Sequence, residues 1–507
     1  MASYESVLDS IGATPLLRLT RSAAGLRPRV YVKPEWQNPG GSVKDRAALS
    51  MLRRAEAEGE LRPGGTVVEV TSGNTGIGLA LAAAHLGYRA VVFTSSTIAQ
   101  EKRAQLTAYG AELRLVDAFV PKDHPDSVHA QGRRFVAETP GAWFAHQYDN
   151  PANPAAHYAT TGPEIWTDTE GTVTHFVATV GTGGTISGTG RYLKEVSGGR
   201  VRVTGADPLT SAYSGGDGSQ KYIEGAGHFV HPETVQDLWP QSLDTTVIDD
   251  YAPVDDQSAI DAVRWLARTE GILAGGSSGV ALAAAFRLAE HLTEDDTVVV
   301  LLPDSGRSYL STYFDDAWLT ANGFTAPTAP DWSGAGNAAG TGTGTGTGIG
   351  TGAGIGTRAG AGAEGRAVGA GADGPTVGAY ATPAPYVERG EAVADAVRRL
   401  AAAGLADDDV VLVVHPRDGR VLAPHPSDVI GWTTPARLRG AAAVAGTARR
   451  VGPKLGRGLA LTDPAVTAWA EGDGEVALVL DQGRVAGTVA RRRLRPQPVQ
   501  RAAEHAG

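Results

Sequence analysis

Short apolar runs alternate with longer amphipathic segments through roughly the first two thirds of the chain. The run Thr66–Val70 is rich in β-branched residues, as buried strands are, and a glycine-rich loop and a helical pattern over residues 76–86 follow it. The same alternation predicts strands over residues 89–94, 112–116, 175–179 and 297–302, and helices over residues 45–58, 98–109 and 186–196. Repeated strand–loop–helix units are typical of parallel sheets with helices on both faces, so the pattern predicts an α/β fold.

This alternation is interrupted once. From about residue 333 to 375 the chain is almost entirely Gly, Ala and Thr. Such a segment buries too little apolar surface to offset its ordering entropy, so it predicts a flexible linker with a root-mean-square span of roughly 35 Å. We therefore expect a body over residues 1–325, a linker over residues 326–380 and a smaller module over residues 381–507.

Composition and charge exclude several classes of partner and of functional site. A chain of 507 residues is too long for one core, and its net charge of −10 and pI of about 5.7 disfavour nucleic acid and anionic membranes as partners. The absence of Cys excludes disulfides, thiolate metal sites and a cysteine nucleophile, and we expect no metal site. No apolar run is long enough to span a bilayer and the N-terminus lacks a secretory pattern, so we expect a cytoplasmic protein.

Two loops that follow predicted strands carry candidate chemistry, because ligands of parallel α/β sheets bind at the carboxyl ends of strands. Thr-Ser-Gly-Asn-Thr-Gly at 71–76 offers hydroxyls, an amide and backbone N–H groups that suit a carboxylate, although a capped helix start needs no ligand. Gly-Thr-Gly-Gly-Thr at 181–185 has the composition of a phosphate cradle. It lacks the Gly-Lys-Ser/Thr ending that binds nucleoside triphosphates, and a glycine-rich turn without a ligand is the alternative.

A lysine completes the pattern. Lys44 directly follows a Gly-Gly turn and directly precedes a predicted helix. A lysine held in a fixed, partly desolvated position can lose its proton and form a Schiff base with a carbonyl, whereas most lysines at helix starts are solvated charges. Two more glycine- and serine-rich loops lie at 275–279 and 303–307. A phosphate site, an amine, a carboxylate site and a hydroxyl donor together suit pyridoxal phosphate and an amino acid.

The motifs as a series resemble a known family. Pro-Gly-Gly-Ser-Val-Lys-Asp-Arg at 39–46, Thr-Ser-Gly-Asn-Thr-Gly at 71–76, Val-Gly-Thr-Gly-Gly-Thr at 180–185, Gly-Gly-Ser at 275–277 and Leu-Pro-Asp-Ser at 302–305 occur in the order found in that family. Residues 4–324 resemble the cystathionine β-synthase and cysteine synthase family of fold type II pyridoxal phosphate enzymes. The resemblance implies two parallel-sheet α/β subdomains with the cofactor between them.

The resemblance also implies roles for individual residues. Lys44 resembles the catalytic lysine that forms the Schiff base with the cofactor, Asn74 the partner of its ring hydroxyl, and Ser277 the partner of its pyridine nitrogen. The phosphate-binding residues by this resemblance are Gly181, Thr182, Gly183, Gly184 and Thr185. The substrate-binding residues by this resemblance are Thr71, Ser72, Gly73, Asn74, Thr75, Gln147, Glu224 and Gly225.

Family membership of this kind implies a lyase that performs β-replacement, and a homodimer or a higher homo-oligomer. Glu-Gly-Ala-Gly at 224–227 resembles the cystathionine β-synthases, which condense L-serine with L-homocysteine through an aminoacrylate, more than the Gln-Gly-Ile-Gly typical of cysteine synthases. Departures at Val70, at residues 208–211 and at His228 leave the acceptor thiol open, so a cysteine synthase that uses O-acetylserine and sulfide is the alternative. A catalytically silent metabolite sensor is a second alternative.

The C-terminal module predicts a helix over residues 393–400 and strands over residues 410–415, 475–481 and 485–489. This pattern resembles a degenerate tandem pair of cystathionine-β-synthase-type regulatory domains, an α+β fold that binds adenosyl ligands. The ribose-binding Asp of the first repeat is Asp428 by this resemblance, but Arg493 stands at the matching position of the second. Because a guanidinium cannot accept hydrogen bonds from ribose hydroxyls, we expect adenosyl-ligand sensing to be weakened or lost.

Overall fold

The smaller half of the body is built on a parallel sheet with strand order β5-β4-β3-β6. Side chains of β3 and β4 point alternately to the two faces of the sheet, one packed against α1, α2 and α3 and the other against α4, as expected for strands with both faces covered. The strands are β3 (Thr66–Val70), β4 (Arg89–Ser95), β5 (Glu112–Val116) and β6 (Ala142–Phe144), and the helices are α1 (Lys44–Glu58), α2 (Asn74–Leu86), α3 (Gln100–Ala108) and α4 (Val128–Glu138). The strands and helices predicted for this region are all present.

The larger half holds a sheet with strand order β1-β2-β10-β7-β8-β9, in which only β1 runs antiparallel to its neighbour. Helices α8 and α9 cover one face, and α6 and α7 cover the other. The strands are β1 (Leu17–Arg18), β2 (Arg29–Pro34), β7 (His175–Thr179), β8 (Arg202–Pro208), β9 (Asp250–Val254) and β10 (Thr297–Leu302). The helices are α5 (Ala152–Ala159), α6 (Thr161–Asp168), α7 (Gly184–Ser197), α8 (Asp256–Glu270), α9 (Gly276–Ala289) and α10 (Asp316–Ala321).

The C-terminal module contains the same strand order twice. In each unit a helix separates two parallel strands along the chain, and the second of these strands pairs antiparallel with a third. The order is β11, α11, β12, β13 in the first unit and β14, α13, β15, β16 in the second. The elements are β11 (Tyr386–Glu388), α11 (Val393–Ala402), β12 (Val411–Val414), β13 (Val429–Thr433), α12 (Pro435–Leu438), β14 (Lys454–Gly456), α13 (Pro464–Glu471), β15 (Val476–Asp481) and β16 (Arg484–Ala490). Apolar residues of β12, β13, β15 and β16 form one shared core, so the two sheets pack together.

Short 3-10 helices supplement these elements. They are η1 (Val7–Ser10), η2 (Glu35–Gln37), η3 (Ala212–Ser214), η4 (Thr245–Val247), η5 (Gly306–Tyr309), η6 (Val377–Tyr380), η7 (Pro426–Asp428) and η8 (Ala445–Thr447). Val377, which we predicted to lie in the linker, is fully buried in the core of the module, so the module begins before residue 381.

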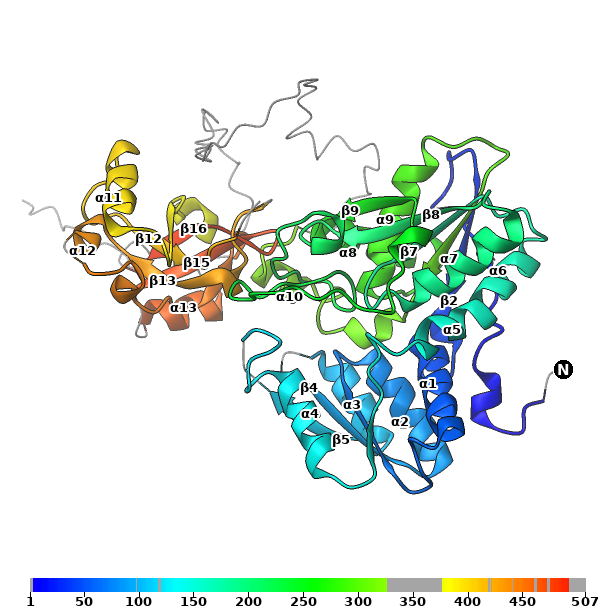
Figure 1. Cartoon of the computed structure of the whole chain (residues 1–507). Helices are drawn as coiled ribbons and strands as arrows, with labels where there is room; N and C mark the ends of the chain where they lie inside the picture. Colours follow the sequence, from blue (N-terminus) through cyan, green and yellow to red (C-terminus); the bar gives the residue numbers. More distant parts are fainter. Residues whose placement is uncertain are drawn as a thin grey trace, which may run out of the picture.

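Figure 1 shows the three parts: the smaller half in blue and cyan, the larger half mainly in green, and the module in yellow to red beside the larger half. This computed structural model describes residues 3–96, 98–116, 120–325, 376–417, 420, 422–439, 441–459, 463–471 and 475–491. Most of the predicted linker, including its Gly-Thr repeat, and Arg493 lie outside these residues. Within the described ranges no helix is both long enough and apolar enough to cross a membrane.

Candidate active site

Lys44 is the first residue of α1, and the turn before it is fixed to the end of β10. Gly41 has a φ of +85°, which a residue with a side chain rarely adopts, and Val43 N–H donates to the Pro303 carbonyl at 2.8 Å. Desolvation by burial lowers the pKa of Lys44 to about 8, although the nearby carboxylate of Asp304 opposes that shift. Roughly a tenth of the amine is therefore neutral at pH 7, far more than for a lysine with an ordinary pKa, and a nucleophile or general base must be neutral.

The loop at residues 71–76 leads from β3 into α2, which begins at Asn74. Asn74 Nδ2 donates to Asp304 Oδ2 at 2.7 Å, and Thr75 Oγ1 donates to Gln147 Oε1 at 2.5 Å. The structure thus brings Asn74, Thr75 and Gln147 together as predicted, whereas Ser72 lies exposed beside them. The first N–H groups of α2 have no carbonyl partner within the helix, so the loop can accept a carboxylate.

Asp304 is a residue whose role we did not predict. It lies two residues after the end of β10 and is 1% exposed. Its Oδ2 accepts hydrogen bonds from Asn74 and from the Tyr309 hydroxyl at 2.6 Å, while its Oδ1 is buried with no hydrogen-bond partner among the described residues. The signal in the sequence was a charged residue close after a strand made almost entirely of apolar residues, where burying an unpaired carboxylate is costly.

The loop at residues 181–185 leads from β7 into α7, which begins at Gly184. A Cβ built on Gly181 would lie 2.7 Å from the Gly225 carbonyl oxygen, so only glycine fits there. Asn153, which we did not predict, donates to the Thr182 hydroxyl at 3.2 Å and to the Gln147 carbonyl at 2.8 Å. It therefore joins the loop at residues 181–185 to Gln147.

Ser277 lies in the first turn of α9 and is 4% exposed. Thr179 Oγ1 donates to the Ser277 carbonyl at 2.6 Å, which ties the end of β7 to this helix. The preceding Gly275 N–H donates to the Asp304 carbonyl at 3.0 Å. The motifs at 39–46, 71–76 and 275–277 therefore each contact the motif at 302–305, and Thr179, which directly precedes the motif at 180–185, contacts Ser277.

Glu224 lies in an ion pair that crosses between the halves of the body. Lys102 of α3 contacts Glu224 Oε2 at 2.7 Å, and its side chain is 1% exposed against 23% for Glu224. The Lys102 ammonium also lies 4.4 Å from the centre of the Tyr309 ring, and a Cβ on Gly73 would lie 2.5 Å from Lys102 Cδ. Lys102 was not predicted, and it connects the loop at residues 71–76 with Glu224. Gly225, next in the chain, is exposed.

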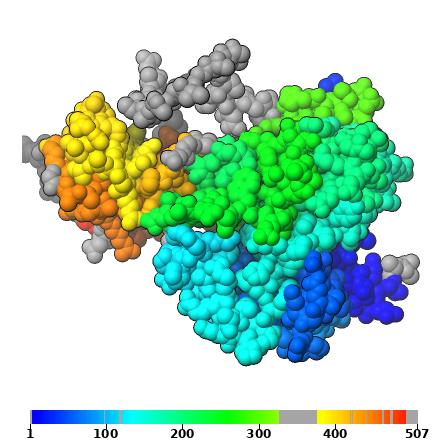
Figure 2. All heavy atoms as spheres, in the orientation of Figure 1, coloured from blue at the N-terminus to red at the C-terminus, as the bar shows by residue number. Residues whose placement is uncertain are grey.

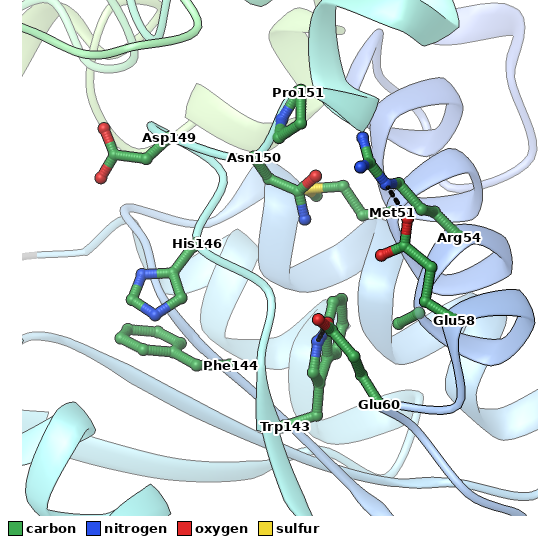
Figure 3. Close-up of a pocket in the computed structure, with 11 residues that line it drawn as sticks. Met51, Arg54, Glu58, Glu60, Trp143, Phe144, His146, Asp149, Asn150 and Pro151 are labelled. Atoms are coloured by element: carbon green, nitrogen blue, oxygen red, sulfur yellow. Dashed lines mark hydrogen bonds and ion pairs between the residues drawn. The ribbon is translucent and has the colours of Figure 1, made fainter.

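A separate pocket lies on the smaller half (Figure 3). Its volume is about 420 Å³, and the Arg54–Glu58 ion pair and the Trp143–Glu60 hydrogen bond lie along its wall. Its other lining residues are Met51, Ala55, Phe144, His146, Asp149, Asn150 and Pro151. None of the candidate site residues lines it, so we assign it no part in the chemistry.

Comparison with known proteins decides the family. The model of the family described as pyridoxal-phosphate dependent enzyme matches residues 7–304. The chain belongs to this family. The match confirms the resemblance found in the motifs, the fold type II architecture and pyridoxal phosphate as the family's cofactor.

Relatives within this family carry several names. The chain is 40% identical to cystathionine β-synthase of Apis mellifera over 328 residues, which cover 63% of each chain. It is 43% identical to O-ureido-L-serine synthase of Streptomyces lavendulae, over 63% of this chain and 98% of that protein, and 42% identical to cysteine synthase of Staphylococcus aureus, over 62% and 98%. The chain spans 63% and 65% of the length of the Apis mellifera and Saccharomyces cerevisiae cystathionine β-synthases.

A solved structure of O-ureido-L-serine synthase superposes with a TM-score of 0.56 at 42% identity, covering 63% of this chain and 99% of that one. A cysteine synthase from Entamoeba histolytica gives a TM-score of 0.56 at 34% identity, covering 61% and 90%. The body of this family member is thus similar to proteins with several different enzyme names.

The residues present fit pyridoxal phosphate. The site offers a partly buried lysine, a glycine cradle at the start of a helix and a buried serine at the start of another. Two buried oxygen atoms near these groups, Asp304 Oδ1 and Ser278 Oγ, have no hydrogen-bond partner among the described residues. Polar atoms buried without partners are costly, and a polar ligand would relieve that cost.

Proposed function

We propose that this protein is a pyridoxal-phosphate-dependent β-replacement lyase that condenses L-serine with L-homocysteine to cystathionine. The observation that carries the choice of acceptor is the placement of Glu224. Lys102 fixes its Oε2, and the side chain keeps 23% of its surface exposed. A fixed carboxylate suits an acceptor with an ammonium group, which homocysteine has and sulfide lacks.

Bound pyridoxal phosphate would supply an electron sink for the α-carbon of an amino acid. The phosphate would rest on residues 181–185 at the start of α7, Ser277 would face the pyridine nitrogen and Asn74 the ring hydroxyl. The lysine that anchors it in this proposal is Lys44. These assignments agree with the burial and hydrogen bonds of the site, and the experiments below test them.

The residues of the chain would perform the remaining steps. The Lys44 amine takes the α-proton of serine and protonates the departing hydroxide. The hydroxyls of Thr71, Ser72 and Thr75, with the N–H groups of Gly73 and its neighbours, hold the substrate carboxylate, and Gln147 and Gly225 border it. The Cβ–O bond of serine breaks, a Cβ–S bond forms, and water is released.

Cysteine synthesis from O-acetylserine and sulfide is the second candidate function. It is favoured by the 42% identity to cysteine synthase of Staphylococcus aureus, of which the chain covers 98%. By contrast, the chain covers only 63% of the Apis mellifera cystathionine β-synthase. We further propose that the protein is cytoplasmic and forms a homodimer or higher homo-oligomer, as the motif resemblance implies.

The test is a comparison of two substrate pairs with purified protein that contains the cofactor. One reaction contains L-serine and L-homocysteine, the other O-acetyl-L-serine and sulfide, and mass spectrometry measures cystathionine and cysteine. Preferential formation of cystathionine supports the proposal. Cysteine formation only with O-acetylserine would replace it by the second candidate, and no turnover with either pair would favour a silent sensor.

A further inference from the structure

The module is seated on the segment of the body that carries Glu224. Arg417, which follows β12, donates through Nη1 to the Val230 carbonyl at 2.9 Å and to the Asp217 carbonyl at 3.3 Å. Arg484, the first residue of β16, donates through Nη2 to the Gln220 carbonyl at 2.8 Å. Figure 2 shows the yellow and orange atoms of the module directly against the green atoms of the larger half.

Both arginines are buried in this interface. Arg484 is 7% exposed and Arg417 is 8% exposed. Arg484 Nη1 also lies 3.2 Å from Ser219 Oγ. A buried guanidinium is strongly destabilising unless its donors are hydrogen-bonded. These contacts with backbone carbonyls therefore favour one position of the module on the segment.

The turn before Arg484 is itself fixed to the body. Gln482 N–H donates to the Gly323 carbonyl at 2.6 Å, and Gly483 N–H donates to the Asn322 carbonyl at 2.8 Å. The ring of Tyr222, which lies in the segment, packs against His425 of the module with ring centres 5.2 Å apart. The module therefore contacts the segment through His425 as well as through the two arginines.

The segment from 217 to 230 contains no helix or strand. Within it, Glu224 N–H donates to the Tyr313 hydroxyl at 3.0 Å, and Gly227 N–H donates to the Val180 carbonyl at 2.6 Å. Its two ends, near Gln220 and near Val230, are bonded to the module. An irregular segment keeps one conformation only where such contacts fix it.

We infer that Arg417 and Arg484 are positioning residues, which hold both ends of the segment from 217 to 230 and thereby set the position of Glu224 at the acceptor side of the active site. The role of Glu224 in this inference rests on the proposed function. The module thus supports the active site of its own chain through two arginines, whether or not it binds an effector.

The test uses the full-length protein with Arg484→Gln, the conservative Arg484→Lys and the milder Ser219→Ala. Arg449→Gln is the matched control, because Arg449 lies in the same module in an exposed ion pair with Glu475. Hydrogen–deuterium exchange is measured on peptides from residues 217–231, and KM is measured separately for homocysteine and for serine.

Arg484→Gln is expected to speed exchange in residues 217–231 and to raise KM for homocysteine by about tenfold, with kcat and KM for serine changed less than about twofold. Arg484→Lys should raise KM for homocysteine less than Arg484→Gln does, and Ser219→Ala should raise it by about threefold. Arg449→Gln should have the same KM values and exchange rates as the natural protein. Unchanged exchange and an unchanged thiol KM would overturn the inference, as would faster exchange through the whole body with all kinetic constants impaired. If the natural protein makes no cystathionine, the proposed function fails, and exchange alone then decides whether the arginines order the segment.

Discussion

Lys102 and Glu224 form an ion pair at 2.7 Å that joins the smaller half of the body to the larger half. The lysine side chain is 1% exposed and the carboxylate 23% exposed. Removing the carboxylate leaves a buried ammonium without its partner, which costs more than losing an exposed pair. This pair therefore links the stability of the protein to the position of Glu224 at the proposed acceptor side.

Glu224→Gln is expected to lower the free energy of unfolding by about 1–2 kcal/mol, a value reduced from that of a fully buried pair because water reaches Glu224. It should also raise KM for homocysteine more than KM for serine. Urea unfolding and steady-state kinetics measure the two effects. Glu475→Gln, which removes a 62% exposed partner of Arg449, is the control and should change neither. Equal KM changes for both substrates would contradict the proposed place of Glu224.

Lys44 is the residue on which turnover should depend most. Lys44→Ala is expected to lower kcat by about 1,000-fold or more, because the variant lacks the amine that takes the α-proton in the proposed function. Lys44→Arg keeps a positive charge, but its guanidinium stays protonated and cannot serve as base or nucleophile, so it should be equally inactive. Product formation measures turnover, and near-normal activity in either variant would refute the assignment.

The pKa of Lys44 makes the stability of the cofactor-free protein depend on pH. Burial lowers that pKa from 10.5 to about 8. Between these two values the unfolded state binds more protons than the folded state, so stability rises as pH increases through this window. The rise attributable to Lys44 should be about 2–3 kcal/mol between about pH 7.5 and pH 10.

The control for this effect is Lys44→Met, which is apolar and does not titrate. The difference in unfolding free energy between the two cofactor-free proteins isolates Lys44 from every other titrating group. Urea unfolding across the pH range measures it. A difference that stays constant with pH would show that burial does not perturb the Lys44 amine.

The sequence predicted strand positions well and helix starts less well. The start of α2 was predicted at residue 76 and α7 at residue 186, but they begin at Asn74 and Gly184. Asn and Gly are poor helix formers, which argued against them. The residues just before, Gly73 and Gly183, have φ values of +139° and +88°, so the turn is completed there and the helix begins at once.

The site was predicted only as far as local motifs reach. A glycine-rich loop, or a lysine after a Gly-Gly turn, can be recognised within one short stretch of sequence. Lys102, Asp304 and Asn153 act through partners more than a hundred residues away or through a neighbouring loop, and hydrophobic periodicity carries no information on such pairs. Only the arrangement of the two halves brings these side chains together.

Asp428 is fully buried, and its two carboxylate oxygens face Arg417 at 3.0 Å and Arg420 at 3.4 Å. A ribose would have to displace a guanidinium from this carboxylate, which would leave a charge buried without a partner. We therefore expect calorimetry with S-adenosylmethionine, and with adenosine monophosphate, to detect no micromolar binding. Micromolar binding of either one would contradict this prediction.

The same ion pairs predict a stability effect that does not depend on any ligand. Asp428→Asn removes the negative charge between Arg417 and Arg420 and is expected to destabilise the module by about 3 kcal/mol. Asp481→Asn is the matched control, because Asp481 is 42% exposed in its pair with Arg457 and should change stability by less than about 1 kcal/mol. Urea unfolding is followed by hydrogen–deuterium exchange of peptides that contain Trp432 or Trp469, which lie in the cores of the module. Because Arg417 also donates to the Val230 carbonyl, Asp428→Asn should in addition raise KM for homocysteine. A stable variant with an unchanged KM for homocysteine would show that Asp428 does not orient Arg417.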